Sequence, residues 1–138
     1  MNKKEAVQIL AILKAAYPSS YNGMTKEEAS GTVSVWAMQF ESIPVDIVMM
    51  AIHKLIASNK FPPTVAEVKD KIKSIHWEAY ESITRMKNFL PEETLKKCEM
   101  IYEATMDYKY GKTYEPSINY MVSGETKLLL GGNNNGNG

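Results

Sequence analysis

Apolar side chains recur at helical spacing along most of the first 110 residues. Between residues 4 and 16 they form a broad stripe opposite lysine, glutamate and glutamine, and between 45 and 57 they surround nearly the whole segment. Residues 65–75 carry a narrower apolar stripe with charged side chains opposite, which is typical of an amphipathic helix. The pattern predicts helices over 4–16, 25–40, 45–57 and 65–75, and further helices over 77–87 and 91–110.

A structural corner is expected between the third and fourth predicted helices. Two adjacent prolines have no N–H to donate, and the second restricts the backbone of the first, so the third helix should end before them. A Thr-x-x-Glu capping box follows the prolines and starts the fourth helix. The corner consists of Phe61, Pro62, Pro63, Thr64 and Glu67. A second interpretation stays open, in which this surface corner also presents Phe61 and Lys60 to a partner.

The second predicted helix has its own start signal and one large aromatic residue. Thr25 and Glu28 form another capping box. Trp36 lies among apolar positions at helical spacing, and an indole can bury a large apolar area while its N–H finds one partner. Trp36 is therefore predicted to be a core anchor; the alternative, a stacking platform for a base, has no support from neighbouring residues.

The sequence predicts an all-α protein: a small helical bundle of four N-terminal helices over 1–76, one or two further helices over 77–111, and a flexible C-terminal tail over 112–138. Trp77 and Ile101 would bury well against the bundle, so the additional helices are expected to pack on it. The tail is polar with few apolar side chains and ends in glycine and asparagine alone, a composition that cannot bury enough apolar surface to fold in isolation.

Composition narrows the possible functions. Lysine and arginine number 16 and balance 16 acidic residues, so the chain lacks the basic footprint of a DNA-binding domain. Arg85 is the single arginine, which leaves almost no material for bidentate contacts to phosphate or guanine. Direct nucleic-acid binding is not expected. Cys98 is the single cysteine, which excludes an internal disulfide and fits a reducing cytosol.

Neither a membrane location nor an enzymatic activity is expected. No apolar run approaches the ~20 residues of a membrane span, and the N-terminal residues do not resemble a signal peptide, so a cytoplasmic location is predicted. The sequence contains no phosphate-binding loop, no zinc-ligand pair and no nucleophile elbow, and His53 and His76 are its only histidines. We therefore expect no catalytic residues, no metal and no cofactor.

Four motifs occur in a fixed order in the first half of the chain. They are Ala16-Tyr17-Pro18, Trp36-Ala37, Ile43-Pro44 and the run from Asn59 to Glu67. With these motifs, residues 3–75 resemble the small bacteriophage proteins that load and inhibit a replicative DNA helicase. The same N-terminal module is similar to part of other phage replication proteins, including replisome organisers. Beyond residue 77 there is no firm match.

The resemblance implies a compact helical N-terminal domain, a flexible C-terminal part and an adaptor without enzymatic activity. Such an adaptor binds the hexameric DnaB-type helicase of the phage or its host inside the bacterial cell, holds it inactive and hands it to an origin-bound organiser protein. In that family the C-terminal segment contacts the helicase. The candidate partner-binding residues implied here are Tyr120, Met121, Val122, Leu128, Leu129 and Leu130. The alternative for them is a tail that folds back on its own domain.

Two other functions remain open at this point. The first is a small DNA-binding or replisome-organiser-type module that reads DNA with the corner and helix from Pro62 to Ile75. The balanced charge and the lone arginine weigh against it, because phosphate contacts dominate such binding. The second is a structural or anti-host protein whose partner is unrelated to replication.

Overall fold

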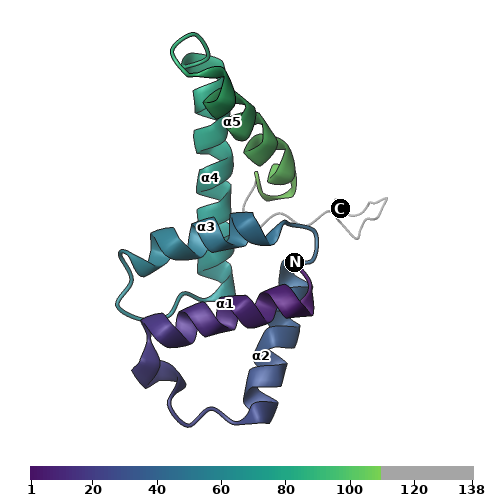
Figure 1. The fold of residues 1–138 in the computed structure, drawn as a ribbon, viewed down its shortest axis with the longest axis vertical. Coiled ribbons are helices and arrows are strands. Elements are labelled where there is room, and N and C mark those ends of the chain that lie inside the picture. Colours follow the sequence, from purple (N-terminus) through teal and green to yellow (C-terminus); the bar gives the residue numbers. More distant parts are fainter. Residues whose placement is uncertain (110–138) are drawn as a thin grey trace, which may run out of the picture.

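A computed structural model of the chain describes residues 1–109 (Figure 1). Within this range the structure contains helices and no strand, so the predicted all-α fold is confirmed. The elements are α1 (Lys3–Ala16), η1 (Pro18–Tyr21), α2 (Lys26–Gln39), α3 (Val45–Ile56), α4 (Val65–Arg85), α5 (Glu92–Ala104) and η2 (Met106–Tyr108), where η marks a short 3-10 helix. The predicted tail over 112–138 lies outside the described residues.

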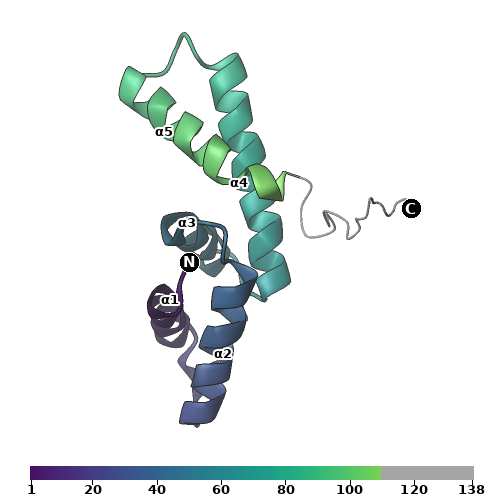
Figure 2. The same cartoon turned by 90° about the vertical axis from the view of Figure 1, so that its right-hand side faces the viewer.

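One hydrophobic core joins α1, α2, α3 and the first half of α4. α1 and α3 lie across the lower part of the molecule, and α2 and α4 cross them (Figures 1 and 2). α3 is apolar nearly all round because helices cover it on more than one side. The largest fully buried apolar side chains are Ile9, Leu13, Phe40, Ile43, Val48, Ile52, Val68 and Ile72.

Three helices of the bundle begin with the same local device. In each case the side chain of the N-cap residue accepts a hydrogen bond from the backbone N–H three residues on, and the glutamate at that position accepts one from the N-cap N–H. This reciprocal pair satisfies backbone donors that a helix start otherwise leaves unpaired. The three pairs are Asn2–Glu5, Thr25–Glu28 and Thr64–Glu67.

The start of α1 is also tied to the end of α2. The α-amino group of Met1 donates to the carbonyl oxygens of Phe40 at 3.0 Å and Ile43 at 2.7 Å. Carbonyl groups at a helix C-terminus lack partners within the helix and carry partial negative charge, so a cation is favourable there.

α4 differs from the prediction, because the helices expected over 65–75 and 77–87 are one continuous helix of 21 residues. No proline or glycine lies between Ile75 and Trp77, and the buried positions continue in register from Ile75 to Ala79. At 1.5 Å per residue the helix is about 32 Å long, which exceeds what the bundle can cover. The boundary expected at residue 76 therefore falls in the middle of a helix.

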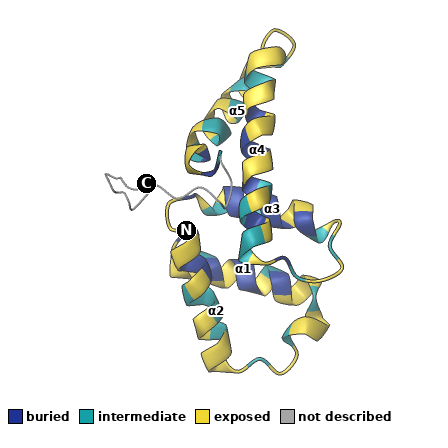
Figure 3. Cartoon of the chain, turned by 180° about the vertical axis from the view of Figure 1, so that it is seen from behind, coloured by how far each residue is buried: buried dark blue, intermediate teal, exposed yellow. Residues whose placement is uncertain are grey.

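The second half of α4 extends away from the bundle, and α5 folds back along it (Figures 1 and 2). We call these two segments, residues 77–104, the arm. α5 packs mainly on α4, and η2 then brings Tyr108 back into the core. Ile101 contacts the core, as expected, whereas Trp77 stays 39% exposed. Figure 3 shows the contrast between the buried faces of the bundle and the largely exposed arm.

The capping pair at the start of α4 can be tested by substitution. Thr64→Ala removes the side-chain acceptor for the Glu67 N–H and should lower the free energy of unfolding by about 1 kcal/mol. Urea denaturation followed by circular dichroism measures the change. The matched control is Thr84→Ala in the same helix, because Thr84 is exposed and bonds only to carbonyl groups of its own helix. The control should change stability by less than about 0.5 kcal/mol, and equal losses in both variants would contradict the capping role.

Candidate partner-binding surfaces

The corner before α4 is held by hydrogen bonds at both of its ends. The Thr64 hydroxyl oxygen accepts from the Glu67 N–H at 3.1 Å, and the Glu67 carboxylate accepts from the Thr64 N–H at 2.9 Å. On the other side, the Tyr17 hydroxyl donates to the Asn59 carbonyl at 3.0 Å, which ties the corner to the end of α1. Pro63 is buried between these two attachments. The corner is therefore a fixed part of the bundle.

The same corner presents an aromatic side chain to solvent. Phe61 is 69% exposed, although the residues around it are held in place. The Lys60 ammonium lies 5.8 Å from the centre of the Phe61 ring, a cation–π arrangement. An exposed aromatic ring on a rigid corner can make an apolar contact at little conformational cost, so Phe61 is available to a partner.

Trp36 lies inside the bundle. Its exposed fraction is 8%, and its ring centre lies 5.6 Å from that of Phe40. Lys69, on the other side of Phe40, places its ammonium 5.9 Å from the Phe40 ring and donates to the Gln39 side chain at 2.6 Å. The indole is thus not placed to stack on a base, and one lysine of the predicted DNA-reading helix is engaged within the fold.

The six tail residues implied by the family resemblance lie outside the described residues. They are Tyr120, Met121, Val122, Leu128, Leu129 and Leu130. The structure thus brings together the predicted corner and leaves the predicted helicase contact as a hypothesis.

Sequence reasoning missed an exposed apolar surface on the arm. The exposed side chains are Trp77, Tyr80, Met86, Phe89, Met100 and Met106. A signal for this surface was present: α4 continues to carry large apolar residues on more faces than one neighbouring helix can cover. Large apolar residues that stay exposed on a folded chain indicate a contact surface.

A buried histidine joins the two helices of the arm at its base. The His76 Nδ1 lies 2.9 Å from the Thr105 hydroxyl, which itself donates to the Ile101 carbonyl at 2.7 Å. The hydroxyl proton is therefore used, so the Thr105 oxygen accepts from an Nδ1–H. The Nε2 then carries no proton, and it is buried without a hydrogen-bond partner. The imidazole also stacks on the Tyr102 ring, with ring centres 4.7 Å apart.

This environment favours the neutral form of His76. Burial lowers its pKa from the ordinary value of 6.5, and the positive charge of Lys109 lowers it further, while a backbone hydrogen bond at Tyr102 acts in the opposite direction. A proton on Nε2 would place a charge in a site with no acceptor for it. The contact between α4 and the end of α5 should therefore weaken when the histidine becomes protonated.

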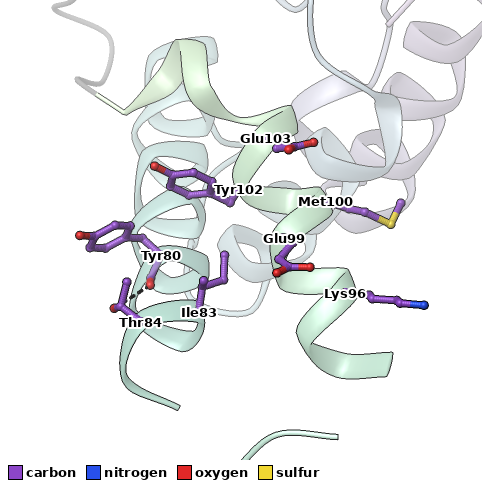
Figure 4. Close-up of a pocket in the computed structure, with 8 residues that line it drawn as sticks. All are labelled: Tyr80, Ile83, Thr84, Lys96, Glu99, Met100, Tyr102 and Glu103. Carbon is purple, nitrogen blue, oxygen red and sulfur yellow. Dashed lines mark hydrogen bonds between the residues drawn. The ribbon is translucent and has the colours of Figure 1, made fainter. Parts of the chain in front are cut away.

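A groove runs between α4 and α5 above this contact (Figure 4). Its volume is about 590 Å³. Tyr80 and Tyr102 close one end, with ring centres 5.9 Å apart, and Met100 extends from α5 with 69% of its surface exposed. The complete lining is Tyr80, Ile83, Thr84, Lys96, Glu99, Met100, Tyr102 and Glu103. An apolar floor with a charged rim suits an apolar side chain beside a charged group.

Two further searches concern residues 1–109 only. Over this range no group of three or more histidine, cysteine, aspartate or glutamate side chains is arranged to hold a metal ion. None of the helices found there has the length and apolarity that crossing a membrane requires.

Comparison with known proteins gives one match. The family model for the N-terminal domain of the gene 39 protein, a phage helicase loader/inhibitor, matches residues 1–69. No curated protein and no solved structure matches significantly. The matched region contains the first three helices, the corner and the first residues of α4, so the arm and its groove lie beyond it.

The buried His76 predicts a pH dependence of stability. Because its pKa is lowered in the folded chain, the unfolded chain takes up the proton first, and stability is lost as pH falls below about 6.5. Urea unfolding at about pH 7.5 and about pH 5.5 should show this loss. His76→Gln should reduce the difference between the two pH values, whereas His53→Gln, at an exposed position on α3, should leave it unchanged. A pH dependence that survives in His76→Gln would contradict the assignment.

Proposed function

The chain belongs to the family of this phage helicase loader/inhibitor, and from that premise we propose that it is an adaptor in phage DNA replication. In this proposal it binds a replicative DnaB-type hexameric helicase of the phage or its host, holds the helicase inactive and loads it at an origin through an origin-binding organiser. The observation that carries the proposal is the family match over 1–69. The family has a non-catalytic role, so we propose no enzymatic activity for this chain.

The proposed helicase contact is the C-terminal part, with Leu128, Leu129 and Leu130 as its main apolar residues and Tyr120 to Val122 as a second group. Short apolar groups within a polar segment bind by burying a small area, and the cost of ordering the segment lowers the affinity. A loader has to release its helicase, so modest affinity suits the task. The rigid bundle serves as the platform from which this segment extends.

Direct reading of DNA by the corner and α4 is the weaker candidate. Positive charge supplies most of the affinity of such modules, and this chain has no net charge. Lys69 is engaged with Gln39 and Phe40 inside the bundle. A gel-shift experiment at low salt distinguishes the two functions, and salt-sensitive binding of DNA by the purified chain would favour the second.

The helicase contact is tested by placing charge on the three leucines. Leu128→Asp, Leu129→Asp and Leu130→Asp, combined in one chain, should weaken helicase binding by at least about 100-fold, because each buried leucine contributes about 1.5–3 kcal/mol. Isothermal titration calorimetry and co-elution with the phage and the host helicase measure the effect. The wild-type chain should also lower the ATP hydrolysis rate of the helicase it binds.

A matched control adds the same charge to the same segment without removing apolar side chains. Asn133→Asp, Asn134→Asp and Asn135→Asp together should leave helicase affinity within about threefold, a difference of less than about 1 kcal/mol. If both triple variants bind as tightly as the wild-type chain, the tail is not the contact. If both lose binding equally, charge rather than apolar contact determines the affinity.

A further inference from the structure

The groove of the arm has a definite chemical preference. Its floor is made of Tyr80, Ile83 and Tyr102, and Met100 forms a wall that is 69% exposed. These side chains can contact aliphatic groups that enter between the two helices (Figure 4). Nothing within residues 1–109 fills the groove, so these apolar surfaces remain in contact with solvent.

The rim of the groove has a net negative charge. Glu99 and Glu103 lie on it with one opposing charge, that of Lys96. A segment that places a single cation next to a short aliphatic run complements both the rim and the floor. In this chain, Lys127 is followed directly by Leu128, Leu129 and Leu130.

The described chain ends beside the groove. The Trp77 indole N–H donates to the Lys109 carbonyl at 2.9 Å, which fixes the last described residue against α4. The Trp77 ring in turn meets the Tyr80 ring edge-on, with centres 5.5 Å apart. From Trp77 to Thr84 the rise along α4 is about 10 Å, so the remainder of the chain starts within two helical turns of the whole groove.

The remaining chain is long enough to reach the groove. Nineteen residues separate Lys109 from Leu128, and they can span at most about 65 Å. Attachment to the same chain makes docking intramolecular, with an effective concentration on the order of millimolar. An intrinsic affinity as weak as millimolar is therefore sufficient to fill the groove about half of the time.

We propose that Lys127 to Leu130 of the same chain dock in the groove between α4 and α5 when no helicase is bound. The leucines contact Met100 and Ile83, and the Lys127 ammonium lies at the rim next to Glu99 and Glu103. The docking itself is a property of the isolated chain. Its consequence, competition between groove and helicase for the same leucines, rests on the proposed function.

The native cysteine allows a direct test in the full-length chain. Cys98 lies on α5 and is the only cysteine, so one nitroxide spin label can be attached there. The paramagnetic label should broaden the backbone NMR signals of Leu128 to Leu130, relative to the same sample with a reduced label. Met100→Asp, on an exposed helix position, should remove most of this broadening while the helical signals of the arm persist.

Two controls define the result. A label at Ser30→Cys in a Cys98→Ser chain, on α2 at the opposite end of the molecule from α5 (Figure 1), should leave the leucine signals sharp. Lys127→Glu should reduce the broadening, and adding Glu99→Lys and Glu103→Lys should restore it.

The outcomes are distinct. Equal broadening in the wild-type and Met100→Asp chains would overturn the proposal, because proximity along the chain would then explain it. Broadening that appears only when labelled chains are mixed with isotope-labelled chains would assign the groove to a second copy and also overturn it. Intramolecular broadening together with a failure to bind any helicase would support the docking and refute the proposed function.

Discussion

The continuous backbone of α4 is the constraint on which the rest of the structure depends. Its first half supplies Val68 and Ile72 to the core of the bundle, and its second half supplies the surface against which α5 packs. A helix transmits direction because every residue in it is fixed by the hydrogen bonds of the next turn. The corner at Thr64 sets where α4 starts, and the bundle sets its direction. The position of the arm and of its groove follows from these two conditions.

The change from bundle to arm coincides with a change in the kind of contact. Around Ile72 the contacts of α4 are apolar and fully buried. One turn later, His76 and Thr105 replace them with a buried hydrogen bond, supported by the Tyr102 ring. Beyond this point α5 has no buried residue of its own. Regions with few buried contacts open at lower free energy than the core, so the arm should open before the bundle, and its groove is the part of the fold best suited to change with a partner.

The sequence predicted the features that depend on neighbouring residues and missed those that depend on distant ones. Helix starts such as Thr25–Glu28 were visible because a capping box is complete within four residues. The break expected after Ile75 was wrong because it was inferred from a change in the apolar pattern without a proline or glycine to cause it. The groove joins Tyr80 to Met100, and only the return of α5 brings them together. Likewise, the exposure of Trp77 depends on how much of α4 the bundle covers.

The extent of the family match separates two parts of the molecule with different roles. Residues 1–69 include the corner, and the corner fixes the start of α4, so a chain that shares this module also shares the direction of the helix that leaves it. Whatever follows residue 69 can then change without altering the bundle. If the leucines are shared between the groove and a helicase, the apparent affinity for the helicase is the intrinsic affinity reduced by the fraction of chains with free leucines. The arm would thus set how readily the helicase is bound and released, while the bundle only holds the arm and tail in position.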